Sequence, residues 1–207
     1  MQQVFPQLIE DKNKSDRLRL ALSQTKDINW DYVIFSDESD LFPDRPGKIH
    51  YRKYPGEIVD LDDGPDYRWD PRKVKVWGAI SKIGVGTLIR YEGTLRGSDY
   101  SDLLNRTLLK DFPLLRGTRT RSGKYSFQHD NAFPHVSKEA KNFLENNHIK
   151  VIDWPSQSPD LNPIENVWGI IKDELYKFNN ELHTADETWE KIKDIWFYDV
   201  NSLLPKL

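Results

Sequence analysis

Apolar residues recur at helical spacing in one segment of the chain, residues 164–175. Asn162 and Pro163 precede this segment, and both residue types are favoured at the start of a helix. We therefore predict a helix with Asn162 as its N-cap and Glu165 in its first turn. The predicted buried face of this helix comprises Ile164, Val167, Trp168, Ile171 and Leu175.

Apolar runs and alternating patterns predict five strands. The continuous run at 32–35 is typical of a central strand covered on both faces, and Ser-Asp-Glu-Ser follows it at 36–39. Residues 74–81 and 84–91 predict a hairpin with a two-residue turn, although Gly84 leaves its register open. Two further strands are predicted at 125–129 and 150–154.

Amphipathic patterns predict four more helices. Three are expected at 15–25, 100–115 and 136–147, and the fourth follows a capping-box sequence at 184–187. Antiparallel strands come first in the chain, and strands then alternate with helices. This order predicts an α/β fold with a mixed sheet and helices on its faces.

Composition restricts the class of protein. The chain has 207 residues, 30% charged and 37% apolar, which suits one folded globular domain. It has no cysteine, so disulfides and thiolate metal ligands are excluded. The net charge of -3 carries no overall nucleic-acid signature. No apolar run approaches the roughly 20 residues of a membrane span, and we expect no signal peptide.

Three carboxylates stand at the ends of predicted elements. Asp37 follows the first strand, Asp130 follows the strand at 125–129, and Glu165 opens a helix. Neighbouring strands lie about 4.8 Å apart, so carboxylates at their ends would be able to share metal ions. Oxygen ligands suit Mg²⁺, and a pair of such ions promotes displacement at phosphorus. We therefore expect the three carboxylates to converge within metal-bridging reach.

Each of these residues also has a purely structural interpretation. Asp37 and Asp130 lie in sequences that commonly form turns. Glu165 completes a capping-box pattern, which explains it about as well as catalysis does. His135 would then be a surface or capping histidine. The basic segment with Arg119, Arg121 and Lys124 would be a solvated loop.

Four sequence blocks resemble the Tc/mariner superfamily of transposases, in its Tc-like branch. The most specific is WPSQSPDLNPIENVW at 154–168, which resembles the third catalytic block of that family. FSDES at 35–39 resembles the first block, FQHDNAFPH at 127–135 the second, and VWGAIS at 76–81 a hairpin strand. Between Asp130 and Glu165 lie 34 residues, as in the branch whose third acid is Glu.

The resemblance implies a fold and a reaction. The implied fold is the RNase H-like, retroviral-integrase-like domain, a mixed five-stranded sheet flanked by helices. Asp37, Asp130 and Glu165 would be the DDE triad, which holds two Mg²⁺ or Mn²⁺ ions. The implied reaction is hydrolytic nicking at transposon ends, followed by attack of the freed 3′-hydroxyl on target DNA.

Supporting residues and partners follow from the same resemblance. Asn131 and His135 match family positions beside the second acid, and would support the site or approach DNA. We expect Arg119, Arg121 and Lys124 to lie near DNA as well. The implied partners are double-stranded DNA, both transposon ends and target, and a second copy of the chain when active. A membrane is not expected, and the implied location is the nucleus.

We expect residues 1–29 to be a helix and linker remnant and residues 30–207 to form the catalytic domain. An irregular insertion that carries one short strand near 49–53 is expected at about 41–73. We expect no paired helix-turn-helix modules before the domain, which suggests a fragment, a decayed copy or a catalytic-domain-only product. The chain departs from the family at Asp40 and Leu41, and at Phe133-Pro134. The alternative functions are an inactive or co-opted module that binds DNA or protein, and a general nuclease of the same fold.

Overall fold

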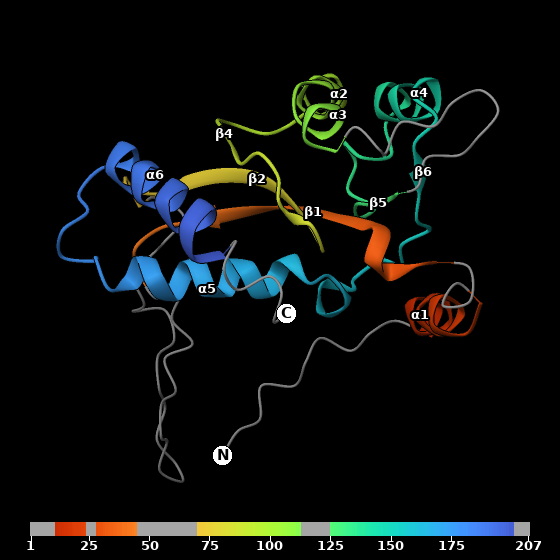
Figure 1. Cartoon of the computed structure of the whole chain (residues 1–207), viewed down its shortest axis with the longest axis horizontal. Coiled ribbons are helices and arrows are strands. Elements are labelled where there is room, and N and C mark those ends of the chain that lie inside the picture. The colour runs from red at the N-terminus through yellow and green to blue at the C-terminus, as the bar shows by residue number, and fades with distance from the viewer. Residues whose placement is uncertain (1–10, 24–27, 45–69, 113–124, 201–207) are drawn as a thin grey trace, which may run out of the picture.

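A mixed β-sheet forms the centre of the protein (Figure 1). The computed structural model describes residues 11–23, 28–44, 70–112 and 125–200. Within these residues the sheet has six strands in the order β3-β2-β1-β5-β6, and β4 also pairs with β2. The strands are β1 (Val33–Leu41), β2 (Val74–Ser81), β3 (Gly84–Val85), β4 (Ile89–Tyr91), β5 (Ser126–Gln128) and β6 (Lys150–Val151).

The pairing of β1 makes the sheet mixed. Its antiparallel register with β2 runs from Ile34↔Ser81 to Leu41↔Val74. Its parallel register with β5 covers three residues, ending at Phe35↔Gln128. Strand β5 then pairs in parallel with β6. The predicted mixed α/β class is therefore confirmed.

The predicted strand at 84–91 is divided into β3 and β4, so the prediction of five strands was one short for the described residues. Ile80 pairs with Val85, whereas Trp77 pairs with Ile89. The β3–β4 side thus holds one more residue than β2 between these two pairs. An extra residue of this kind interrupts the ladder as a bulge. The predicted two-residue turn after Ser81 is present.

Helices cover both faces of the sheet (Figure 1). One core cluster joins β1 and β2 to α5, α6 and η7, and a second joins the other face to α2, α3 and α4. A third, smaller cluster holds α1 against Val33 and Trp154. The elements are α1 (Asp11–Ser23), α2 (Gly97–Arg106), α3 (Leu108–Asp111), α4 (Lys138–Asn146), α5 (Ile164–Tyr176), α6 (Ala185–Asp194), the π-helical turn η7 (Ile195–Val200), and the 3₁₀ turns η2 (Trp30–Tyr32) and η6 (Pro159–Leu161).

The predicted buried face of the helix at 164–175 is confirmed, since all five side chains are at most 1% exposed. Trp168 stacks on Trp196 at a centroid distance of 5.5 Å. Gly78 of β2 gives these indoles room, because a Cβ there would lie 2.8 Å from Trp196 and 2.9 Å from Trp168. The missing side chain is thus what lets α5 and η7 pack closely on the sheet.

Other helix predictions need adjustment. The predicted helix at 100–115 begins at Gly97 and is interrupted at Thr107, whose hydroxyl donates to the Leu103 carbonyl at 2.7 Å. The capping box at Thr184 and Glu187 is confirmed. Most of the expected insertion at 41–73, with its short strand at 49–53, lies outside the described residues.

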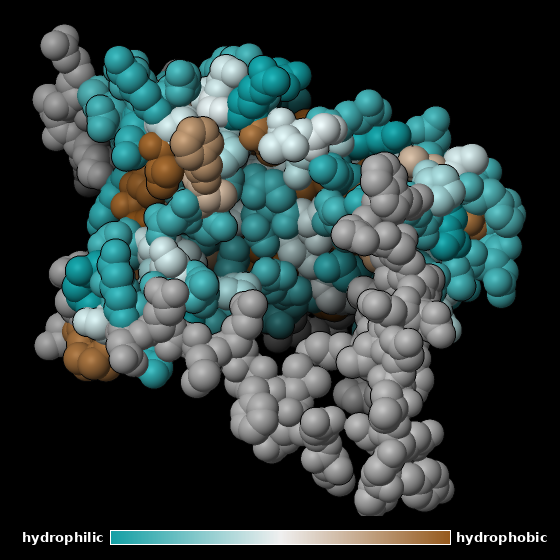
Figure 2. Space-filling view, turned by 180° about the vertical axis from the view of Figure 1, so that it is seen from behind, coloured by the Kyte–Doolittle hydropathy of each residue, from teal (hydrophilic) through white to brown (hydrophobic). Residues whose placement is uncertain are grey.

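The described surface seen in Figure 2 is mainly hydrophilic, with hydrophobic side chains gathered in small groups. Of the helices that the structure describes, none combines the length and the apolar character needed to cross a membrane.

Candidate active site

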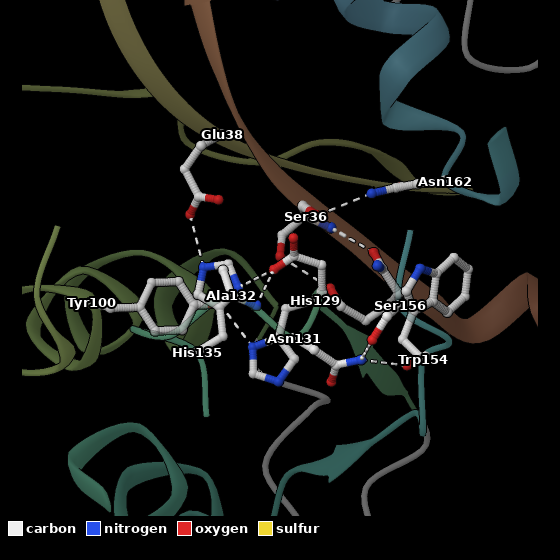
Figure 3. A network of polar contacts seen from close by, with 12 residues as sticks. Ser36, Glu38, Tyr100, His129, Asn131, Ala132, His135, Trp154, Ser156 and Asn162 are labelled. Carbon is white, nitrogen blue, oxygen red and sulfur yellow. Dashed lines mark hydrogen bonds and ion pairs between the residues drawn. The ribbon is translucent and has the colours of Figure 1, made fainter. Parts of the chain in front are cut away.

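Strands β1 and β5 separate at the point where the acidic residues follow. Beyond the Phe35↔Gln128 pair, side-chain hydrogen bonds replace the next backbone hydrogen bonds between the two strands. The Ser36 amide donates to Gln128 Oε1 at 3.4 Å, and Asn162 Nδ2 donates to the Ser36 carbonyl at 3.2 Å. The Ser36 hydroxyl donates to the Gln128 carbonyl at 3.0 Å (Figure 3). Because buried backbone groups need partners, these side chains allow the two strands to diverge.

A cavity of about 430 Å³ lies where the strands diverge. Asp37, Asp130 and Glu165 all line it, although they come from β1, from the segment that follows β5 and from the first turn of α5. The structure therefore brings together the three carboxylates that the sequence singled out. The remaining lining residues are Gln128, Asn131, Ala132, Asn162 and the loop at 154–159.

Asp37 lies within β1, and the prediction that the strand ends before it was wrong. Antiparallel pairing with β2 continues through Asp37↔Gly78 to Leu41, after the parallel pairing with β5 has stopped. Successive side chains of a strand face opposite sides of the sheet. Asp37 consequently faces the α5 side, and Glu38 faces the side covered by α2 and α4.

The charge around Asp37 is strongly negative. Burial first, and then the neighbouring carboxylates of Glu38, Glu165 and Asp130, together raise the pKa of Asp37 to about 7. In the part of the chain that the structure describes, no three acidic or histidine side chains form a ready-made metal-binding cluster. The expected convergence to metal-bridging reach is therefore not found among the described residues, where the three carboxylates share the lining of one cavity instead.

Asp130 is held in its ionised form. Its Oδ1 accepts hydrogen bonds from the Ala132 amide at 2.9 Å and from His135 Nδ1 at 2.6 Å (Figure 3). Burial alone would raise the pKa of Asp130, but these two donors outweigh burial and lower it. Asp130 therefore carries its negative charge at neutral pH.

His135 is buried, so the alternative of a surface histidine does not apply. Its side chain is 4% exposed, and Nε2 lies 3.1 Å from Glu38 Oε1. Burial would lower the pKa of His135, but hydrogen bonds with Asp130 and Glu38 raise it to about 10. Both ring nitrogens thus act as donors to carboxylates.

Two more rings, Tyr100 and His129, complete this network, and no local pattern in the sequence indicated a role for either. The Tyr100 ring lies 4.2 Å from the His135 ring, and the Tyr100 hydroxyl lies 3.0 Å from His129 Nδ1. His129 stacks on His135 at 5.2 Å. Burial, together with the nearby His135, lowers the pKa of His129 to about 3, so His129 is neutral.

Asn131 fastens the loop that forms one wall of the cavity. Its Nδ2 donates to the Trp154 carbonyl at 2.7 Å and to Ser156 Oγ at 3.3 Å. Helix α1 holds the same loop from outside, because Asn13 donates to Gln157 at 2.8 Å. No local sequence signal identified this contact, which joins residues 144 positions apart.

Glu165 opens onto the cavity and does not cap its helix. Helix α5 has Pro163 at its N-cap position and no side-chain cap hydrogen bond, so the capping-box interpretation of Glu165 was wrong. The predicted N-cap, Asn162, lies one residue before the N-cap position, although its Oδ1 accepts a hydrogen bond from the Ile164 amide at 3.4 Å. Its Nδ2 also ties the start of α5 to β1. The predicted DNA-proximal residues Arg119, Arg121 and Lys124 lie outside the described residues.

Sequence comparison places the chain among known proteins. A family model described as DDE superfamily endonuclease matches residues 32–198. The Tc3 transposase of Caenorhabditis elegans is 31% identical over 194 residues, which cover 91% of this chain and 55% of that protein. The Tcb1 transposase of Caenorhabditis briggsae is 32% identical, with 89% and 69% covered. The chain thus spans little more than half of the Tc3 transposase.

Structural comparison points the same way for the fold. The Mos1 transposase catalytic domain, in a structure with raltegravir and Mg, superposes with a TM-score of 0.54 at 16% identity, covering 97% of this chain and 96% of that domain. The Mos1 paired-end complex with the left transposon end gives 0.57 at 19%, covering 98% and 62%. The RNase H-like fold is confirmed, and the chain belongs to the DDE superfamily endonucleases, among the Tc/mariner transposases.

Proposed function

We propose that residues 30–207 form the catalytic domain of a DNA transposase, which cuts DNA strands at transposon ends and joins the freed ends to target DNA. One observation carries the proposal. Three carboxylates, from β1, from the segment after β5 and from the start of α5, line one cavity in a chain that belongs to a DDE endonuclease family. The proposed triad is Asp37, Asp130 and Glu165.

The chemistry of the cavity fits divalent metal ions. Its acidic donors are carboxylate oxygens, which Mg²⁺ and Mn²⁺ prefer. The raised pKa of Asp37, which reflects burial and three neighbouring carboxylates, indicates negative charge that a cation would neutralise. We propose that Asp37, Asp130 and Glu165 hold two such ions. When bound, these ions would supply activation of the attacking oxygen and stabilisation of the leaving oxygen at phosphorus.

The protein's own residues prepare the site for this chemistry. The two donors on Asp130 hold its carboxylate ionised, and the first turn of α5 places Glu165 at the cavity. In the first reaction, a water oxygen attacks phosphorus and the bond to the 3′ oxygen breaks, which leaves a 3′-hydroxyl. In the second, that hydroxyl oxygen forms a bond to a target phosphorus and displaces the 3′ oxygen there.

The proposed partners are double-stranded DNA and a second copy of the chain. Support comes from the similar Mos1 transposase, which forms a paired-end complex with the left transposon end. Arg119, Arg121 and Lys124 would lie near the DNA backbone, where cations contribute affinity. A protein with these substrates would act in the nucleus.

The first experiment measures Mn²⁺ binding to the purified chain by calorimetry. We expect Glu165→Gln to abolish binding, because it removes a charged ligand. Glu174→Gln is the matched control, since Glu174 lies on the same helix and pairs with Lys177. Unchanged binding in Glu165→Gln would contradict the assignment of Glu165.

The second experiment measures nicking and strand joining on duplexes that carry the inverted repeats flanking the gene. We expect activity with Mg²⁺ or Mn²⁺ in the wild type and none in Asp130→Asn. Equal activity in both proteins would remove Asp130 from the mechanism. A chain that retains DNA without binding Mn²⁺ would instead support the co-opted module.

A further inference from the structure

The two hydrogen bonds to Asp130 converge on one of its oxygens. The Ala132 amide and His135 Nδ1 both donate to Oδ1, at 2.9 Å and 2.6 Å. Among the described residues, no hydrogen bond reaches Oδ2. The carboxylate is therefore held through one of its two oxygens only, and a rotation about its Cβ–Cγ bond would break both hydrogen bonds.

His135 is itself fixed by what surrounds it. Glu38 Oε1 lies 3.1 Å from Nε2, so the ring is held at both nitrogens. The Tyr100 ring at 4.2 Å and the stacked His129 ring at 5.2 Å pack against it (Figure 3). With 4% of its side chain exposed, the imidazole has little room to turn over. Glu38, His135 and Asp130 thus form a rigid chain of contacts.

The side chains of β1 alternate between the two faces of the sheet, and this alternation places Glu38 on the face where it contacts His135. Asp37 faces the cavity on the α5 side of the sheet, and Glu38 faces the opposite side, where His135 lies. Their adjacent positions let one strand contribute an acid to the cavity and a support for the second acid. The pairing of Glu38 with His135 joins residues 97 positions apart.

We propose that Glu38 and His135 are positioning residues, which hold Asp130 so that Oδ2 alone is presented to the cavity for a single bond to a metal ion. This inference rests on the proposed function, in which Asp130 is a metal ligand. Partners behind a ligating group set its orientation, and their loss typically weakens metal binding by about 10- to 100-fold. Glu38 would therefore act on the metal ion without touching it.

The test compares Mn²⁺ dissociation constants, measured by calorimetry on the purified chain, with melting temperatures recorded in parallel. We expect Glu38→Ala to weaken Mn²⁺ binding by about 10-fold. Glu38→Gln keeps an acceptor for His135 Nε2 and should restore most of the affinity. Glu92→Ala is the matched control, because the Glu92 side chain is 90% exposed and lies outside the network.

A double-mutant cycle separates positioning from general stability. His135→Asn keeps an amide donor near the place of Nδ1 but is too short to reach Glu38. If the three residues act as one chain, adding Glu38→Ala to His135→Asn should cause no further loss of affinity. Additive losses would overturn the inference, and so would a Glu38→Ala chain that melts earlier but binds Mn²⁺ as the wild type does.

The two proposals fail in different ways. A wild-type chain that binds no Mn²⁺ would refute the proposed function, and this inference with it. Wild-type binding that is unchanged in both Glu38→Ala and His135→Asn would refute the positioning role alone.

Discussion

Replacing Asp37 by Asn should make the metal-free protein more stable at neutral pH. The pKa of Asp37 is raised from 3.8 to about 7, by burial first and then by Glu38, Glu165 and Asp130. The folded protein therefore binds more protons than the unfolded chain between about pH 4 and pH 7. The free energy of unfolding falls as pH rises through this window, because Asp37 in the folded protein then has to carry a negative charge in buried, negatively charged surroundings. Asn carries no such charge and can keep the contact with the Glu38 amide.

The magnitude follows from the pKa difference. A change from 3.8 to about 7 corresponds to about 4 kcal/mol, at about 1.36 kcal/mol per pKa unit. Asp37 lines an open cavity, so solvent screening reduces the gain, and we expect about 2 kcal/mol at pH 8. For a chain of this size, that equals a rise of about 4–8 °C in melting temperature.

The assay is a thermal melt at pH 4.5 and at pH 8, with and without Mn²⁺. At pH 4.5 the wild type and Asp37→Asn should melt at similar temperatures. At pH 8 without Mn²⁺, the variant should melt at a higher temperature than the wild type. Mn²⁺ should stabilise only the wild type, by about 2.7 kcal/mol in the free energy of unfolding when its concentration is 100 times the dissociation constant.

Asp40→Asn is the control for the Asp37 experiment, since Asp40 lies on the same strand but is 47% exposed and pairs with Lys73. Loss of that exposed ion pair should cost about 0–1 kcal/mol. The reasoning about Asp37 is refuted if Asp37→Asn melts lower than the wild type at pH 8, or if Mn²⁺ stabilises both equally.

Three further predictions concern the framework of the site. Gly78→Ala should lower the free energy of unfolding by about 1–3 kcal/mol, because its Cβ would overlap the stacked indoles. Gly169→Ala on α5, where a Cβ meets nothing within 4 Å, should raise the free energy of unfolding by up to about 1 kcal/mol. Urea unfolding measures both changes. Asn162→Ala should cost about 1–3 kcal/mol by leaving the buried Ser36 carbonyl without its donor, and a cost equal to that of the exposed neighbour change Asn166→Ala would contradict this role. Thr184→Ala should cost about 1 kcal/mol in a melt, since Thr184 caps α6; no change would show that the cap is redundant.

Local patterns in the sequence predicted the elements that depend on neighbouring residues. The apolar stripe of α5 and the capping box at Thr184 are short-range features, and both are confirmed. The tight turn after Ser81 is another. In each case the residues that decide the structure lie within a few positions of one another, so periodicity and side-chain chemistry suffice.

Boundaries were less predictable where pairing between distant segments decides them. Strand β1 continues through Asp37 because β2, more than 30 residues later, pairs with it as far as Leu41. The start of α5 is likewise tied to a distant segment, since Asn162 Nδ2 donates to the Ser36 carbonyl, 126 positions away. The local preference for a turn at Asp37 was overridden by hydrogen bonds that only the folded chain makes.

The sequence by itself determined the mixed α/β class, the buried face of α5 and which carboxylates are candidate site residues, because residue type and local spacing encode these features. Only the tertiary structure decided that Asp37, Asp130 and Glu165 line one cavity, and that Glu38 and His135 lie behind Asp130. These relations join residues far apart in the chain. They depend on strand register and on which face of β1 each side chain occupies, and no local pattern specifies either.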